Sequence, residues 1–355
     1  MTVCMQVVSS MNSPNLISES DYQSAMARRL YRRALATGRI EVPAVPSMID
    51  EYVKMCNAVF NAIGVIFNED ELGHLRGVLI GELATAFAAS ARSVIVITYD
   101  CPVGSVVNYH VKAEWSSLEV EYEKWFATRQ PPFFGTEPDA RVWKLAMASA
   151  QPEQFPILDI GAGTGRNSIP LARRGHPLDA VELTGKFVDI IRQDAQKESL
   201  KLRVFQHNIF DHLPELRQDY QLIILAEVAT DFRSTEQLRS IFTLASTSLA
   251  PGGCLVLNAF FPKNGYIPNE ATRQLGQQFY STIFTDMDLS SALEGLPLSL
   301  ISDESVYEYE KTHLPAAAWP PTGWYEGWIT GRDVFDVERE QSPIELRWLV
   351  YQKFI

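Results

Sequence analysis

The sequence predicts an α/β protein whose main part is a doubly wound, mostly parallel sheet. From residue 157 onwards, short apolar strands alternate with helical stretches at the spacing of β–α–β units. A glycine-rich turn joins the first of these strands to its helix. Near the C-terminus, residues 298–301 and 344–352 are strand-like, with no regular helix expected between them. We therefore assign these two runs to an antiparallel pair at the sheet edge.

A mostly helical region with a β-hairpin is expected before the sheet. Capping patterns predict helices over 18–37 and from 47, the first ending at Gly38, and apolar side chains at helical spacing predict a third helix from 68. The β-branched run 93–99 and the alternating run 107–115 flank a Pro/Gly turn, which predicts the hairpin. After a helix over 116–127, a Pro/Gly-rich connector separates an N-terminal region, 1–128, from a second domain, 129–355.

The second domain is expected to follow a regular order. Helices are predicted over 141–150, 166–174 and 235–249, and strands over 157–160, 178–183, 202–206, 220–226 and 254–260. The run YQLIILA at 220–226 is apolar except for Gln221, which is typical of a parallel strand covered on both faces.

The turn after the first strand carries the most specific pattern in the chain. Asp159 is followed by glycines at every second position, namely Gly161, Gly163 and Gly165. Glycine lets the main chain approach a ligand where a Cβ would collide. A dinucleotide fingerprint, G-x-G-x-x-G, would need a glycine at 166 or 168, which hold arginine and serine. The spacing therefore disfavours a pyrophosphate-containing cofactor.

The pattern D-x-G-x-G-x-G resembles motif I of the class I S-adenosylmethionine-dependent methyltransferases, and the resemblance extends over about 138–355. It implies a Rossmann-like, seven-stranded sheet with an antiparallel last strand, and S-adenosyl-L-methionine as cofactor. The residues that match the family's cofactor site are Asp159, Gly161, Ala162, Gly163, Gly165, Glu182, Leu183, Asn208, Ile209 and Ala226. Glu182 matches the acid that binds the ribose hydroxyls, with an N-cap role as its alternative. Asn208 stands where the family usually has Asp, and its amide oxygen can still accept a hydrogen bond from adenine.

Composition and net charge limit the classes of partner that the protein is expected to bind. The 355 residues are 46% hydrophobic and 21% charged, as in an ordinary globular enzyme. The formal charge of -12 argues against nucleic-acid binding. No apolar run has transmembrane length and the N-terminus lacks signal-peptide features, so we expect a cytoplasmic protein without a membrane partner. Its four cysteines are scattered without a C-x-x-C pair, so no metal site is predicted.

The resemblance implies methyl transfer to a small-molecule acceptor, because the motifs of nucleobase and glutamine methylases are absent after Leu225. A hydroxyl or carbon acceptor would need a general base, whereas a deprotonated amine would not. The candidate bases are Glu227, Asp231, His207 and His313. Each has a plainer alternative: a cofactor contact for Glu227, a helix cap for Asp231, and ordinary surface or core positions for both histidines.

An aromatic segment near the C-terminus is a candidate wall of the acceptor pocket. It contains Trp319, Trp324, Tyr325 and Trp328, separated by prolines and glycines, and the acids Asp303, Glu304, Glu308 and Glu310 precede it. Such a wall would suit a cationic or aromatic acceptor. The alternative is that the rings fill the core beneath the edge strands.

Two further hypotheses concern the whole chain. The apolar helices of residues 1–128 are expected to pack over the carboxyl ends of the strands and to wall the acceptor pocket, with dimerisation as the alternative role. A methyltransferase-like module that binds the cofactor without turnover is the alternative to an enzyme. A nucleotide-dependent oxidoreductase is less consistent with the glycine spacing.

Overall fold

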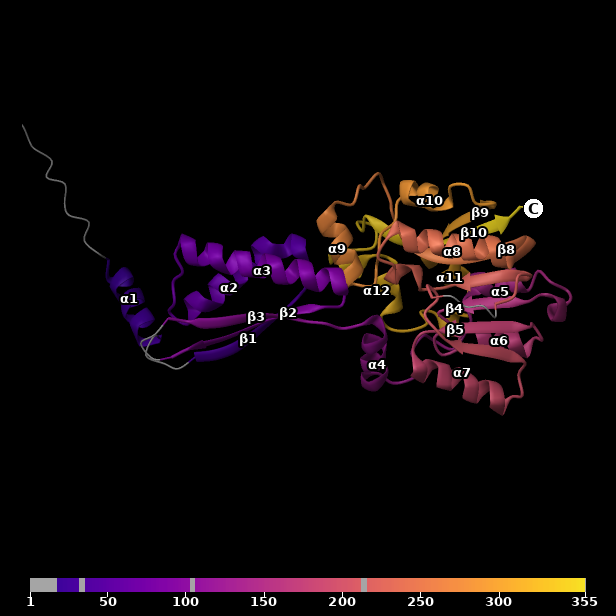
Figure 1. The fold of residues 1–355 in the computed structure, drawn as a ribbon, viewed down its shortest axis with the longest axis horizontal. Coiled ribbons are helices and arrows are strands. Elements are labelled where there is room, and N and C mark those ends of the chain that lie inside the picture. The colour runs from indigo at the N-terminus through magenta and orange to yellow at the C-terminus, as the bar shows by residue number, and fades with distance from the viewer. Residues whose placement is uncertain (1–17, 32–35, 103–105, 212–215, 355) are drawn as a thin grey trace, which may run out of the picture. The chain divides into compact units, whose positions relative to one another are not determined.

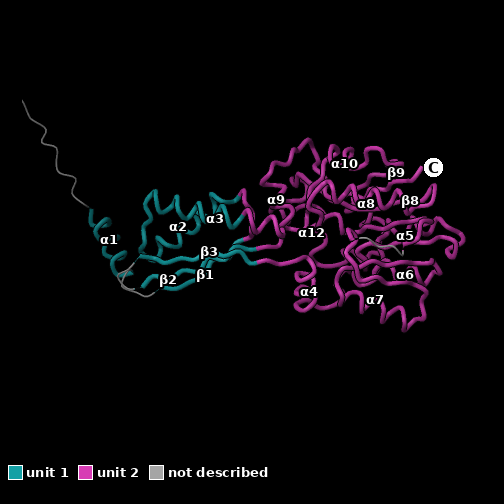
Figure 2. Tube along the Cα trace, viewed as in Figure 1, with its two compact units in different colours: residues 1–42, 48–83, 94–114 teal, residues 43–47, 84–93, 115–355 magenta. Residues whose placement is uncertain are grey.

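The computed structural model of the chain describes residues 18–31, 36–102, 106–211 and 216–354. The chain divides into two compact units (Figure 2). The first contains residues 1–42, 48–83 and 94–114, and the second contains 43–47, 84–93 and 115–355. Among the described residues, no helix is both long enough and apolar enough to cross a membrane.

The first unit combines helices with a small sheet (Figure 1). Its elements are α1 (Glu19–Tyr31), β1 (Ala36–Pro43), α2 (Ile49–Ala62), most of α3 (Glu69–Ala89), β2 (Val94–Cys101) and β3 (Asn108–Glu114). The predicted hairpin is confirmed, because β2 and β3 pair antiparallel with Val94 opposite Glu114. Phe60 of α2 packs against the sheet, with its ring centroid 5.5 Å from that of Tyr99.

The prediction of one helix over 18–37 is wrong at its C-terminal end. Helix α1 stops at Tyr31, and Ala36–Pro43 is a strand beside β2; residues 32–35 lie outside the described part. Gly38 is therefore a strand residue and no helix cap. A Cβ at Gly38 would lie 2.2 Å from the Tyr99 hydroxyl oxygen, so close packing across the sheet explains the glycine.

The second unit contains, in the described part of the chain, a seven-stranded sheet of order β6-β5-β4-β7-β8-β10-β9. Its strands are β4 (Ile157–Ile160), β5 (Leu178–Glu182), β6 (Leu202–Gln206), β7 (Tyr220–Leu225), β8 (Leu249–Pro262), β9 (Leu298–Ser305) and β10 (Ile344–Lys353). The pairs from β6 to β8 are parallel, and β10 is antiparallel to both β8 and β9. The doubly wound fold with an antiparallel last strand is therefore confirmed.

Helices cover both faces of this sheet (Figure 1). One core lies under α5 (Ala140–Ala146), α6 (Ser168–Arg173), α7 (Gly185–Lys197), α11 (Val306–His313) and α12 (Tyr325–Ile329). The other lies under α8 (Thr235–Ser248) and α10 (Asp286–Leu293). From Leu222 to Leu225, successive residues of β7 alternate between the two cores, which explains the continuous apolar run in this strand. The remaining helices are α4 (Leu118–Thr128), α9 (Glu270–Gln278), α13 (Arg332–Phe335) and short 3-10 turns.

The expectation of no regular helix between the last two strands is wrong. Helices α11, α12 and α13 occupy that segment, and prolines at 315, 320 and 321 keep the first two apart. Glu310 of α11 is fully buried, where it accepts hydrogen bonds from the backbone N–H groups of Ala140 and Arg141 and from the Trp348 indole. This acid, expected beside an acceptor, instead ties α11 to the start of α5 and to β10.

The strand order predicts where a ligand binds to this sheet. The chain runs outward from β4 to β5 and β6, then returns to place β7 on the other side of β4. At such a reversal the loops after neighbouring strands diverge, and open α/β sheets bind ligands there, outside the carboxyl ends of the strands.

Candidate functional site

A cavity of about 570 Å³ lies where β4, β5, β6 and β7 end. Such a volume is within the usual range for small-molecule sites. Of the sequence-predicted site residues, the structure brings together on its lining Asp159, Gly161, Ala162, Gly163, Glu182, Leu183, His207, Asn208, Ile209, Ala226, Glu227 and Asp231. Other contributions to the lining come from Ala89, Ser90, Ser117, Leu118, Glu119 and Tyr122.

The glycine loop is shaped by close contacts. Gly161, Gly163 and Gly165 have φ of +70°, +55° and +87°, values that other residues rarely adopt. A Cβ at Gly161 would lie 2.2 Å from Val228 Cγ2, so the loop touches the segment after β7. Gly165 lies outside the lining, and a Cβ there would come within 2.9 Å of Ile169 Cγ1. Its glycine is explained by loop-to-helix packing.

Glu182 connects the end of β5 to the glycine loop. One carboxylate oxygen accepts a hydrogen bond from the Gly163 N–H at 2.8 Å, and the other accepts from the Thr184 N–H at 2.7 Å. The residue is buried, and burial raises the pKa of Glu182, although the two hydrogen bonds lower it. Each oxygen keeps a further lone pair for a ligand hydroxyl.

Asp159 stands beneath the loop. Its carboxylate accepts a hydrogen bond from the Ser168 hydroxyl at 2.6 Å, which joins the end of β4 to the start of α6. Burial raises the pKa of Asp159 to about 7, although the Ser168 hydroxyl lowers it.

Arg166, immediately after the glycine loop, lies on the lining between two carboxylates. It donates to Asp139 at 2.5 Å and to Glu227 at 2.7 Å. Burial raises the pKa of Glu227 to about 7 against the effect of Arg166. Glu227 also has φ of +62°, held by a hydrogen bond from its N–H to Asn258 at 2.6 Å. The carboxylate is thus fixed in an ion pair facing the pocket.

The other candidate bases differ in their surroundings. Asp231 lies on the lining, where Arg92 and Tyr122 hold its carboxylate. His207 is also on the lining, and its backbone N–H donates to the Glu182 carbonyl at 2.9 Å. His313 is exposed at the end of α11, stacked on Tyr309 and outside the lining.

The aromatic residues of the C-terminal segment pack on one another outside the lining. Tyr325 and Trp328 are buried, whereas Trp319 and Trp324 are partly buried. Trp319 and Trp324 each meet Tyr325, with ring centroids 5.9 and 6.0 Å away. This segment, expected to be irregular, forms helix α12 from Tyr325 to Ile329.

Several residues that line the cavity were not predicted from the sequence. Arg166 had a usable signal, because it directly follows the glycine loop. Phe134, which would meet a Cβ on Gly163 at 3.2 Å, lies in a connector without periodicity. Tyr122 of α4 carries no local signal, since an aromatic residue in a helix is usually a packing residue.

Comparison with known proteins gives one match in sequence. A family model described as a methyltransferase domain matches residues 157–253, which include the glycine loop, Glu182 and Asp231. No curated protein matches the chain.

Solved structures with a similar arrangement include several methyltransferases. Geranyl diphosphate C-methyltransferase from Streptomyces coelicolor A3(2) is 16% identical, with a TM-score of 0.47, over 60% of this chain and 75% of that chain. A putative sarcosine dimethylglycine methyltransferase from Galdieria sulphuraria is 15% identical, with a TM-score of 0.46, over 61% of this chain and 85% of that chain.

The matched residues include the ends of β4 to β7, where the pocket lies, and the sheet has the seven strands and the antiparallel last strand that the resemblance implied. Residues 157–253 therefore match a methyltransferase domain, and the sheet around them has the class I methyltransferase fold, whose cofactor is S-adenosyl-L-methionine.

Proposed function

We propose that the protein transfers a methyl group from S-adenosyl-L-methionine to a small-molecule acceptor bound in the same cavity. One observation carries the proposal. The lining that contains the glycine loop and Glu182 also contains Tyr122, Asp231 and Phe232, which the family motif does not assign to the cofactor. A single cavity of about 570 Å³ thus offers polar groups for two ligands.

The residues present fit the proposed cofactor. A Cβ at Gly161 would collide with Val228, so glycine lets the loop lie against the segment after β7 at the edge of the cavity. Glu182 would accept from the ribose hydroxyls through its remaining lone pairs, and Leu183 and Ile209 supply apolar surface for adenine. Asn208 uses its side-chain oxygen to accept from the Phe210 N–H at 3.1 Å, which leaves one lone pair on that oxygen for the adenine amino group.

The protein's own contribution is positioning. The cofactor supplies a methyl group that is already activated on a sulfonium. Holding two reactants in line within a closed cavity contributes on the order of 7–11 kcal/mol in favourable cases. The Arg166–Glu227 pair fixes one carboxylate beside the reacting groups, and the partly apolar wall of Phe134, Phe187 and Phe232 excludes water.

The acceptor end of the cavity would be walled partly by residues from the first 128 positions. This proposal is supported by Ala89, Ser90, Ser117, Leu118 and Tyr122, all on the lining. Dimerisation, a cytoplasmic location and the absence of a nucleic-acid partner stay predictions.

The test begins with isothermal titration calorimetry of the intact protein with S-adenosylmethionine, S-adenosylhomocysteine and NAD. We expect the first two to bind and NAD not to bind. Release of S-adenosylhomocysteine is then measured with a panel of phenols, amines, thiols and carboxylic acids. Absence of cofactor binding would refute the proposal, whereas binding without turnover on any member would favour a non-catalytic module.

A further inference from the structure

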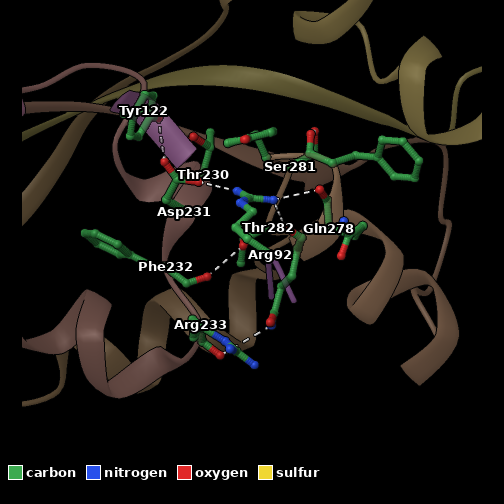
Figure 3. Close-up of polar contacts among 12 residues, drawn as sticks. Arg92, Tyr122, Thr230, Asp231, Phe232, Arg233, Gln278, Ser281 and Thr282 are labelled. Carbon is green, nitrogen blue, oxygen red and sulfur yellow. Dashed lines mark hydrogen bonds and ion pairs between the residues drawn. The ribbon is translucent and has the colours of Figure 1, made fainter. Parts of the chain in front are cut away.

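Arg92, Tyr122 and Asp231 form a largely buried cluster (Figure 3). Tyr122 and Asp231 also line the cavity. Asp231 ends the 3-10 helix Ala229–Asp231, just beyond β7. One of its oxygens pairs with Arg92 at 2.5 Å, and the other accepts a hydrogen bond from the Tyr122 hydroxyl at 2.9 Å. The Arg92 and Asp231 side chains are each only 7% exposed, so the ion pair is largely removed from water.

Arg92 is fixed by more than this pair. Its guanidinium also donates to the carbonyl oxygens of Gln277 at 2.5 Å and Gln278 at 2.7 Å, and it lies 3.4 Å above the centroid of the Tyr280 ring. With both terminal nitrogens of the guanidinium engaged, Arg92 holds the Asp231 carboxylate in one orientation.

The 3-10 helix is held from a second side. The Thr282 N–H donates to the Thr230 carbonyl at 3.0 Å, and the Thr282 hydroxyl donates to the Phe232 carbonyl at 2.7 Å. Burying an ion pair of this kind is weak evidence for a stabilising role, because desolvation offsets most of the attraction. A carboxylate held this rigidly beside a cavity is better explained by chemistry performed there.

The hydrogen-bond directions show which group faces a ligand. Each Asp231 oxygen has one partner, and the carboxylate is only 7% exposed and neutralised by Arg92. Tyr122 is partly exposed, donates its proton to Asp231 and keeps both lone pairs on its own oxygen. Tyr122 and Asp231 both line the cavity. An acceptor hydroxyl would therefore donate to the Tyr122 oxygen, and Asp231 would stand one step behind.

We propose that Tyr122 is a catalytic residue that receives the proton of a phenolic acceptor while passing its own proton to Asp231, with Arg92 as the positioning residue. This inference rests on the proposed methyl transfer. The acceptor O–H bond breaks as a Tyr122 O–H bond forms, and the original Tyr122 O–H bond breaks as an Asp231 O–H bond forms. A C–O bond forms to the methyl group while its bond to sulfur breaks, and that electron pair stays on sulfur.

The surroundings favour this direction of transfer. Burial raises the pKa of Tyr122 well above its usual range, with Asp231 adding to the effect, so Tyr122 stays protonated at neutral pH. Burial also raises the pKa of Asp231 despite Arg92, which makes it a stronger base than a free carboxylate. A phenol is the acceptor class that fits, because a hydroxyl needs a base and the aromatic residues Phe134, Phe210 and Phe232 line the same cavity.

The probe is 4-nitrophenol, whose ionised form absorbs visible light, with 4-nitroanisole as its counterpart without the hydroxyl. Binding of both is measured on protein saturated with S-adenosylhomocysteine, and methyl transfer from S-adenosylmethionine is followed as loss of the phenolate absorption. Tyr122→Phe and Asp231→Asn are compared with Tyr266→Phe, which loses a hydroxyl that is hydrogen-bonded to Thr272.

We expect wild type and Tyr266→Phe to prefer 4-nitrophenol over 4-nitroanisole and to methylate it. Tyr122→Phe should lose the preference and slow transfer at least about 100-fold, the usual scale of acid–base catalysis, with S-adenosylhomocysteine affinity within about threefold of wild type. Asp231→Asn should slow transfer similarly, because the relay loses its base, and should lower the pH at which the bound probe ionises, because the negative charge beside it is gone. Arg92→Lys should shift that pH profile towards the profile of Asp231→Asn.

Several results would overturn the relay. They are no methylation of 4-nitrophenol by wild type, a preference that survives in Tyr122→Phe, or a wild-type pH profile in both Asp231→Asn and Arg92→Lys. Failure of wild type to bind S-adenosylhomocysteine would instead refute the proposed function itself, which separates the two conclusions.

Discussion

Replacing Glu182 by glutamine tests how the end of β5 supports the glycine loop. The change preserves side-chain size but removes one of two carboxylate oxygens. In the native protein each oxygen has its own backbone donor, the Gly163 N–H at 2.8 Å and the Thr184 N–H at 2.7 Å. Glutamine can satisfy only one of these, and its NH₂ group must then face the other N–H.

The expected magnitude follows from these two contacts. A hydrogen bond to a charged group contributes about 1.5–3 kcal/mol, and an unsatisfied buried donor costs a similar amount. Burial raises the pKa of Glu182, so removing its charge recovers part of that loss. We therefore expect Glu182→Gln to lower the free energy of unfolding by about 1–2 kcal/mol. Affinity for S-adenosylhomocysteine should fall about tenfold, the loss of one hydrogen bond to the ribose.

Urea denaturation gives the stability and isothermal titration calorimetry gives the affinity. The control is Glu198→Gln, the same chemical change in an exposed ion pair with Arg173, which should leave both values close to wild type. If Glu182→Gln matched this control in both measurements, the carboxylate would support neither the loop nor the ligand, and the reasoning would fail.

Three other substitutions test the site's architecture. Gly161→Ala should destabilise the protein by about 1–2 kcal/mol and weaken S-adenosylhomocysteine binding, because its φ is +70° and its Cβ would lie 2.2 Å from Val228. Arg92→Met should cost about 3–5 kcal/mol in urea denaturation, since it leaves Asp231 buried without its counterion. Asp159 has a folded-state pKa raised to about 7 from 3.8, so the free energy of unfolding falls as pH rises between these values, by up to about 1.4 kcal/mol per pH unit. Asp159→Asn should reduce that fall in urea denaturations at pH 5 and pH 7.

Matched variants check each expectation. Gly252→Ala also requires a positive φ, +80°, but a Cβ there meets open space, so it should leave ligand affinity unchanged. Arg173→Met breaks an exposed pair and should be close to neutral. A Gly161→Ala protein with wild-type affinity, an Arg92→Met protein as stable as Arg173→Met, or an unchanged pH slope in Asp159→Asn would each contradict the corresponding argument.

The second unit was predictable because its signals are local. A strand covered on both faces is apolar on both sides, and β7 shows this in five of its six residues, Tyr220–Leu225, with Gln221 as the exception. The glycine spacing after Asp159 reflects positive φ values that the loop requires, so the sequence itself predicts this part of the backbone geometry. Glu182 was identifiable for the same reason, since it stands at the end of the next strand.

Local signals were misleading in two segments, one in each unit. Residues 36–43 follow a helix without a strong break, and they form a strand because β2 offers them a partner. Between β9 and β10, the aromatic residues and prolines hid three short helices whose positions depend on the core they cover. In both cases tertiary contacts override weak local preference.

The sequence by itself thus determined the sheet, the glycine loop and the class of cofactor, because each follows from a local pattern: the alternation of strands and helices or the spacing of the glycines. Only the tertiary structure decided what stands beside that loop. Asp231 contacts Arg92, which is 139 positions away in the sequence, and Tyr122, which is 109 positions away. No residue near any of the three in the sequence indicates these contacts. An ion pair and a hydrogen bond between distant segments form only when the folded backbone brings those segments together. No periodic pattern in the sequence predicts which distant segments will meet.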